Sequence, residues 1–268
     1  MKTQMNIKLK GCLSIISKKY KVFMFELIIL GSFVGVLAGF FGIGGGTILV
    51  PLLLFFGIDT KEAIGIAVLQ MVFSSIYGSY LNNKKGTLDV QMVILIGIGG
   101  FIGALLSGYI TSSFNDSTLE IIFLSFALFA LVRVFFKTKE HKKEIELNKM
   151  LLISIGIPLG AVSMTIGVGG SIILVPILVG FLHVPLKKAI SAGLFFVVFS
   201  SVAGLVSHGV VGNINYESGI VIGAASLFGV YFGIYLKDKV DSVLQRKLLI
   251  AFYVFVVSYL AYRIFLEV

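Results

Sequence analysis

The sequence predicts an all-α, polytopic membrane protein built from two homologous repeats. Of its 268 residues, 57% are hydrophobic and only 13% are charged. The mean hydropathy of +1.04 lies far above the range of soluble domains. Apolar runs long enough to cross a bilayer recur along the chain. A glycine-rich motif occurs twice, at 42–51 and 167–176, with seven of ten positions identical.

The apolar segments fall into two length classes. Two short runs, 47–57 and 172–182, directly follow the glycine motifs. At about 1.5 Å per residue, each covers about half of the hydrocarbon thickness. We therefore expect two broken helices, each continued by a half-length helix. The segments near the spanning length of about 18 to 20 residues are 24–41, 63–81, 90–111, 119–136, 150–166, 189–206, 218–236 and 248–265.

The likeness between the two halves extends beyond the motif and defines a repeat of about 126 residues. Each repeat is expected to contain a glycine-broken first helix and three spans, giving seven or eight spans in all. The matched residues include Gly35 and Gly160, Phe73 to Ser75 and Phe199 to Ser201, and Gly103 and Gly229. Gly103 and Gly229 are predicted to lie at helix contacts, where a side chain would push the backbones apart. The expected divisions are a basic tail at 1–23, repeats at 24–136 and 149–268, and a charged linker at 137–148.

Three topologies differ in whether the broken segments cross the membrane. If both cross, the chain has eight spans; if only the first crosses, it has seven, with 20 of the 22 Lys and Arg residues in the cytoplasm. If neither crosses and the N-terminus is outside, the cytoplasmic side holds 14. Loop charge favours the seven-span scheme, whereas repeat symmetry favours equal behaviour of the two segments.

The cations lie almost entirely in loops and in the tail. We therefore infer that the cations behind the net charge of +9 orient the spans in the membrane and contact anionic lipid headgroups, and that they do not bind nucleic acid. The tail runs into a spanning helix without a small-residue cleavage signature, so we expect it to be uncleaved. Tail and linker are both expected in the cytoplasm.

The glycine motifs are the predicted substrate site. Broken, glycine-interrupted helices at corresponding positions of two halves are the best sequence pointer to a binding site in secondary transporters. Because a half-helix that starts at such a break aims free N–H groups and a positive dipole end into it, the site suits a small anion. Tight helix packing is the alternative role for these glycines. The residues are Gly44, Gly45, Gly46 and Thr47 in the first motif, and Gly169, Gly170 and Ser171 in the second.

Further polar and helix-bending residues lie near the motifs. Pro51 and Pro176 each free a carbonyl that could hold a cation or water, or simply kink the half-helix. His208 is considered as a proton-linked residue. Additional substrate contacts are predicted at matching depth in both halves, although serines in membrane helices often bond their own backbone; these are Gln70, Ser74, Ser75, Ser200 and Ser201.

Several other classes of protein are disfavoured. Gly42 to Thr47 resembles a dinucleotide-binding turn but lacks the third glycine and follows a helix-length apolar run. With the single cysteine, Cys12, in the tail, neither a disulfide framework nor a cysteine metal site is expected. No catalytic group, cofactor or metal is expected, so an intramembrane enzyme is disfavoured.

The block from Ala38 to Pro51, its partner at 167–176 and the Phe-Ser-Ser segments resemble the sulfite exporter TauE/SafE family, also called the toluenesulfonate uptake permeases. The resemblance covers the chain from about Phe25 onward. It implies a polytopic carrier of the bacterial inner membrane, built by duplication, for sulfite, a sulfonate or another small organosulfur anion. We therefore expect alternating access to a midplane site, with a coupling proton or Na⁺. An anion channel or a non-transporting membrane partner of a complex is the alternative.

Overall fold

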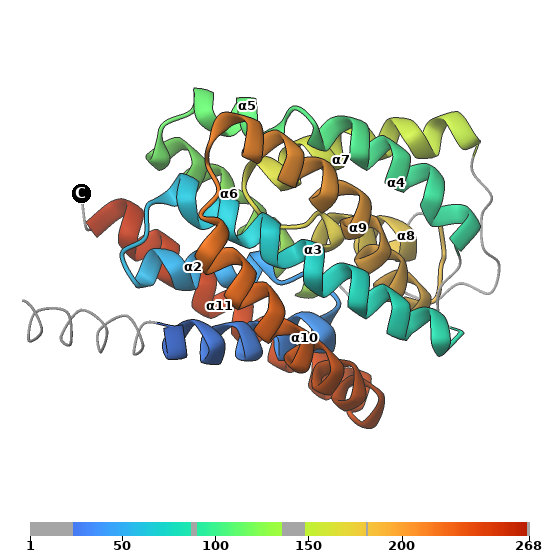
Figure 1. Ribbon diagram of the computed structural model, residues 1–268. Coiled ribbons are helices and arrows are strands. Elements are labelled where there is room, and N and C mark those ends of the chain that lie inside the picture. Colours follow the sequence, from blue (N-terminus) through green and yellow to red (C-terminus); the bar gives the residue numbers. More distant parts are fainter. Residues whose placement is uncertain (1–23, 87–89, 136–147, 181, 267–268) are drawn as a thin grey trace, which may run out of the picture.

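The computed structural model describes residues 24–86, 90–135, 148–180 and 182–266, and every regular element within them is a helix. The helices of the first half of the described chain are coloured from blue to green in Figure 1. They are Met24–Phe41, then α2 (Gly46–Phe55), α3 (Thr60–Lys84), α4 (Val90–Ala104), α5 (Ser107–Ser113) and α6 (Asp116–Phe135). The predicted tail at 1–23 and nearly all of the linker lie outside the described residues.

The second half repeats this order of helices around the second break. Its elements are α7 (Lys149–Thr165), α8 (Ser171–Gly180), α9 (Leu186–Val211), α10 (Tyr216–Lys239) and α11 (Ser242–Leu266). With one exception, the helices match the segments predicted from hydropathy to within a few residues at either end. Both half-length helices, α2 and α8, are present where the sequence predicts them.

The exception is the predicted span 90–111, which is divided into α4 and α5 at Leu105 and Leu106. Polar side chains satisfy the backbone at this interruption. Ser207 Oγ donates to the carbonyl of Leu105 at 2.7 Å, and Ser107 Oγ donates to that of Ala104 at 2.7 Å. Irregular backbone is tolerated at this depth because the protein itself supplies the lost hydrogen bonds.

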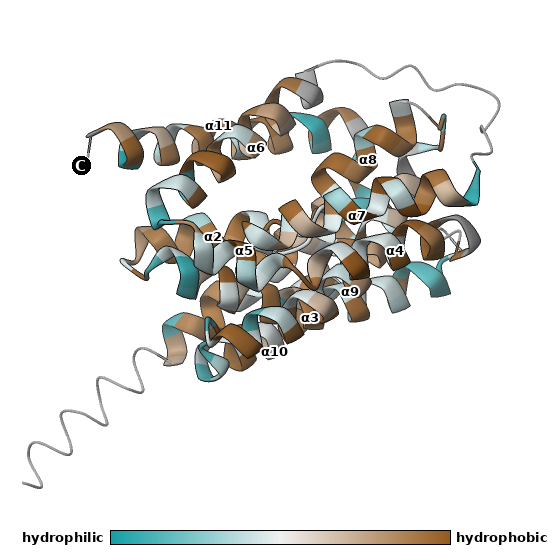
Figure 2. Cartoon of the chain, turned by 90° about the horizontal axis from the view of Figure 1, so that it is seen from above, coloured by the Kyte–Doolittle hydropathy of each residue, from teal (hydrophilic) through white to brown (hydrophobic). Residues whose placement is uncertain are grey.

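The surface of the bundle is suited to lipid. Six helices within the described residues are long and apolar enough to cross a membrane, fewer than the seven or eight expected spans. Many large apolar side chains point outward, among them Phe228 and Phe265, which are about three-quarters exposed. Hydrophobic segments dominate the middle of the helices, and most hydrophilic segments lie near their ends (Figure 2). The chain is a multi-pass helical membrane protein.

Small residues bring the helices of the two halves into close contact. Residues 31–39 of the first helix pack against residues 222–230 of α10, and residues 99–103 of α4 pack against 153–157 of α7, in the same order in both pairs. A Cβ atom on Gly103 or Gly229 would collide with a backbone carbonyl of the facing helix. The prediction that these two glycines lie at helix contacts is confirmed.

The helix directions show how each broken segment runs. The first helix, α3 and α10 are parallel, because residues 69–78 of α3 pack against residues 219–230 of α10 in the same order. The half-helix α2 therefore runs back toward the end of the bundle where the first helix begins (Figure 1). α7 and α9 are likewise parallel to α4. Since α8 connects α7 to α9 in the sequence, it runs back in the same way as α2.

The equivalent helices α3 and α9 run in opposite directions. Gly65 near the start of α3 meets Asn213, just after the end of α9, whereas Gly78 further along α3 meets Leu194 in the first half of α9, so the order is reversed. Since α7 is parallel to α9 and the first helix to α3, the helices that follow the tail and the linker begin at opposite ends of the bundle, at Met24 and Lys149. From the sequence, by contrast, the tail and the linker are both predicted on the cytoplasmic side of the membrane.

Candidate functional site

The first glycine break joins the first helix to α2. Residues 42–45 are not helical, and Gly44 has φ +70°, a left-handed conformation that glycine adopts without strain. The carbonyl of Gly45 accepts the N–H groups of Ile48 and Leu49 at 3.1 and 2.9 Å. Among the described residues, no backbone carbonyl accepts from the N–H groups of Gly46 and Thr47, which begin α2. These are the free donors expected at a helix N-terminus.

The second break, between α7 and α8, has the same backbone design. Gly169, the counterpart of Gly44, has φ +85°. The carbonyl of Gly170 accepts the N–H groups of Ile173 and Leu174 at 3.2 and 3.0 Å, as Gly45 does in the first break. α8 then begins at Ser171. The duplicated sequence therefore folds into similar local geometry, except at the glycine before each half-helix: Gly45 has φ −69° and Gly170 has φ +71°.

The two breaks are in direct contact. Thr47 Oγ1 donates to the carbonyl of Val168 at 3.1 Å, and a Cβ atom on Gly46 would collide with the carbonyl of Gly167. Met71 and Val197 line both breaks: Met71 Sδ lies 3.6 Å from a Cβ placed on Gly44 and 2.9 Å from one placed on Gly169. The sequence-predicted residues of the two motifs are therefore brought together in the interior. Met71 and Val197 were not predicted.

Gln70 covers the first break. Its side chain is fully buried, and neither amide atom has a hydrogen-bond partner among the described residues. The amide lies against Gly45, the residue that caps α2, so closely that a Cβ atom there would collide with it. A buried amide is normally hydrogen-bonded, so this arrangement indicates a place where a polar ligand or water fits.

Phe196 covers the second break. Its Cε1 would lie 2.7 Å from a Cβ atom on Gly170, and Ser163 Oγ would lie 2.8 Å from it. Ser171, the first residue of α8, is buried, and its hydroxyl has no hydrogen-bond partner in the described part of the chain. Phe196 was not predicted, although the repeat offset of 126 places it opposite Gln70.

The remaining predicted contacts lie on α3, α9 and the half-helices. Ser74, Ser200 and Ser201 donate to carbonyls of their own helices at 3.2 to 3.4 Å, as serines in membrane helices often do. Ser75 is buried, and its hydroxyl has no partner among the described residues. Pro51 and Pro176 lie inside α2 and α8, which continue through them.

His208 lies beside the end of α7, which leads into the second break. It is fully buried, and its Nε2 is 3.1 Å from the carbonyl of Met164. Its Nδ1 has no partner among the described residues. The carbonyl of His208 accepts the N–H of Asn213 at 3.1 Å, which connects this histidine to the turn between α9 and α10.

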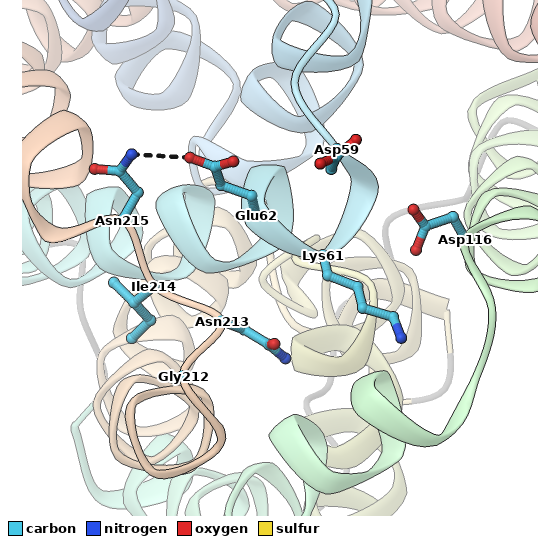
Figure 3. Close-up of a pocket in the computed structure, with 8 residues that line it drawn as sticks. All are labelled: Asp59, Lys61, Glu62, Asp116, Gly212, Asn213, Ile214 and Asn215. Carbon is cyan, nitrogen blue, oxygen red and sulfur yellow. Dashed lines mark hydrogen bonds between the residues drawn. The ribbon is translucent and has the colours of Figure 1, made fainter.

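That turn lines a polar pocket of about 580 Å³ at one end of the bundle (Figure 3). Glu62 accepts a hydrogen bond from Asn215 at 2.8 Å, and Lys61 donates to the carbonyl of Ser112 at 3.3 Å. Sequence reasoning missed this pocket, because its residues come from three turns. The lining residues are Asp59, Lys61, Glu62, Asp116, Gly212, Asn213, Ile214 and Asn215.

A second polar cluster holds the outer end of α2. Glu120 accepts hydrogen bonds from Thr60 Oγ1 at 2.7 Å and from Arg263 Nε at 3.2 Å. Arg263 Nη1 also donates to the carbonyl of Leu54, near the end of α2, at 2.9 Å. The half-helix is therefore tied to α6 and α11 at its outer end and to Val168 at its inner end.

A multi-pass helical bundle in which two half-helices begin at touching breaks in the interior has features expected of a membrane transporter. The comparison with family models agrees with this class. The model described as Sulfite exporter TauE/SafE matches residues 27–260, so the chain belongs to that family. It is a membrane transporter, and the resemblance noted in the sequence is confirmed.

Curated relatives are membrane transporters as well. The chain is similar to a probable membrane transporter protein of Methanocaldococcus jannaschii, with 28% identity over 80% of this chain and 86% of the relative. It is also similar to the probable membrane transporter proteins YunE and YdhB of Bacillus subtilis. Their identities are 24% over 81% and 89% of the two chains, and 25% over 82% and 93%. No solved structure matches the chain.

Proposed function

We propose that this protein is a secondary transporter of the cytoplasmic membrane of a bacterium for a small anion: sulfite, a sulfonate or another small organosulfur anion. The observation that carries the proposal is the contact between the two breaks, through Thr47 and Val168 and through Gly46 and Gly167. Two half-helix N-termini thereby open onto one interior region. Sulfur oxyanions are chosen because the family is described as one of sulfite exporters.

Helix ends supply the positive field of this site. The buried polar residues of the described chain include no lysine or arginine, so an anion would rely on backbone N–H groups and the dipoles of α2 and α8. Each favourable helix end contributes about 0.3 to 2 kcal/mol, and each charge-assisted hydrogen bond about 1.5 to 3 kcal/mol. These gains offset part of the desolvation of the anion and leave weak binding, which suits turnover.

Alternating access would follow from two inverted repeats, each a returning broken segment plus three spans. Three observations support this layout: the antiparallel packing of α3 on α9, the parallel packing of each first helix on the other half, and the matched breaks. An axis in the membrane plane would relate the halves, so exchanging their conformations would turn the site from one side to the other.

The polar pocket of Figure 3 would be one mouth of the substrate path. His208 lies between it and the second break, joined to Asn213 on one side and to Met164 on the other. A histidine in this position could take up the coupling proton, which would make transport pH-dependent. Coupling to Na⁺ through freed carbonyls of the broken helices is the other possibility.

The transport proposal is tested by anion flux in proteoliposomes. Wild-type protein should carry sulfite or methanesulfonate down a gradient, and Gly45→Leu should abolish that flux, because its side chain would occupy the space above the N-terminus of α2. Phe56→Leu is the control: Phe56 directly follows α2 at its other end, has a φ of −80°, and is 64% exposed. Equal flux in wild type and a folded Gly45→Leu would place the site elsewhere.

A further inference from the structure

The two breaks are covered by chemically different side chains at one matched position of α3 and α9. Residue 70 of α3 and residue 196 of α9 are equivalent in the repeat. Each lies over the glycine that precedes a half-helix: the Gln70 amide over Gly45, and the Phe196 ring over Gly170. A ring cannot bond an anion through its face, so the polar groups of the region are unequally divided between the breaks.

Gln70 supplies both kinds of hydrogen-bonding group at the first break. Its amide has two N–H donors and one carbonyl acceptor, and both atoms are buried without a partner among the described residues. The free N–H groups of Gly46 and Thr47 add only donors. Donors are what an oxyanion needs, but the Gln70 carbonyl can be satisfied only by a group that donates.

The charge of the region limits the charge of the ligand. The N-terminus of a helix carries the equivalent of about half a positive charge, so α2 and α8 together provide about one. No lysine or arginine appears among the buried residues of the described chain. The desolvation cost of an ion grows with the square of its charge, and a divalent anion would therefore be strongly disfavoured.

We propose, on the basis of the transport function above, that Gln70 makes the first break selective for a monovalent oxyanion that also carries a hydrogen-bond donor. The oxyanion lies toward the N–H groups of α2 and the Gln70 NH₂ group. The hydroxyl or other donor of the ligand binds the Gln70 carbonyl. Phe196 and Val197 form the apolar side of the site.

The test compares three anions in proteoliposomes: 2-hydroxyethanesulfonate, ethanesulfonate and sulfate. The two sulfonates are monovalent and differ by one hydroxyl group, whereas sulfate is divalent. Wild-type protein should prefer the hydroxylated sulfonate by about tenfold in kcat/KM, the effect of one hydrogen bond of about 1.4 kcal/mol, and should transport sulfate most slowly. Gln70→Met, which keeps the length of the side chain but removes its polar atoms, should reduce the sulfonate preference to about one.

Two further variants complete the design. Gly45→Ala keeps the Gln70 residue but displaces its amide from the N-terminus of α2, so it should weaken the same preference. This variant tests the role of Gln70 even if Gln70→Met folds poorly. Ser79→Ala is the matched control: Ser79 lies on the same helix, nine positions further on, and is buried with an unpartnered hydroxyl in the described structure. It should retain the wild-type preference.

The possible failures can be told apart. Equal transport of the two sulfonates by wild type, or an unchanged preference in Gln70→Met and Gly45→Ala, would overturn the role of Gln70 and leave the transport function standing. Sulfate transport as fast as that of the sulfonates would overturn the restriction to monovalent anions. No flux of these anions, of sulfite or of methanesulfonate above that of protein-free vesicles would refute the transport function itself.

Discussion

The break before α2 and the break before α8 share seven of ten residues, but different side chains cover them. Their backbones match in two pairs of left-handed glycines and in the carbonyls that start each half-helix, although Gly45 is helical where Gly170 is left-handed. The first break meets the buried amide of Gln70, and the second meets the ring of Phe196. Duplication has therefore preserved most of the backbone geometry, while the chemistry has diverged on the neighbouring helices α3 and α9.

The most decisive way to break this comparison is to test whether the halves are inverted equivalents at all. We expect Cys12 in the tail and a cysteine introduced by Lys143→Cys in a Cys12→Ser background to face opposite sides, because the helices that follow them begin at opposite ends of the bundle. An impermeant thiol reagent applied to intact cells should label one of the two and not the other. Labelling of both, or of neither until lysis, would contradict the inverted arrangement.

The next largest effect should separate the two covering side chains. Gly45 has a helical φ of −69°, so Gly45→Ala should change stability little but lower transport about tenfold by displacing the Gln70 amide. Gly170 has φ +71°, where alanine costs about 1 kcal/mol or more. Gly170→Ala should therefore lower the melting temperature in detergent. Equal stability and equal flux in the two variants would mean that the breaks do not differ in function.

The smallest effect concerns the hydroxyl group of each motif. Thr47→Val removes the bond to Val168 and should destabilise the protein by about 1 kcal/mol. Ser171→Ala removes a hydroxyl that has no partner among the described residues, so stability should stay within about 0.5 kcal/mol, with only a moderate loss of flux. Thermal unfolding of both variants beside wild type measures the difference; a larger loss in Ser171→Ala would reverse the assignment.

Hydropathy and repetition predicted the helices, the half-length segments and the contacts of Gly103 and Gly229, because these depend on local composition and on backbone approach. The direction of a short apolar segment does not follow from its length. Charge counting favoured a first segment that crosses the membrane, whereas α2 runs back toward the start of the first helix. Counting Lys and Arg residues uses only the loops, whereas the direction of α2 follows from the packing between helices.

The site was predicted in part for the same reason. The glycine motifs and Gln70 were identified from sequence, and the structure brings them together. Phe196, Met71 and Val197 were missed, since one apolar residue in an apolar helix carries no signal of its own. The pocket beside Glu62 and Asn215 was also missed, because it forms only where three separate turns meet.

The first helix of each half packs against a helix of the other half, and this has a consequence for biogenesis. Ser32 donates to the carbonyl of Ala225, 193 positions away in the sequence, at 3.5 Å. A ribosome adding about 5 to 20 residues per second needs on the order of 10 to 40 seconds to reach that partner. During this interval the glycine face of the first helix lacks the surface that covers it in the finished protein, and lipid or an insertion factor must occupy it. The N-terminal half is therefore a dependent intermediate of synthesis rather than a completed unit.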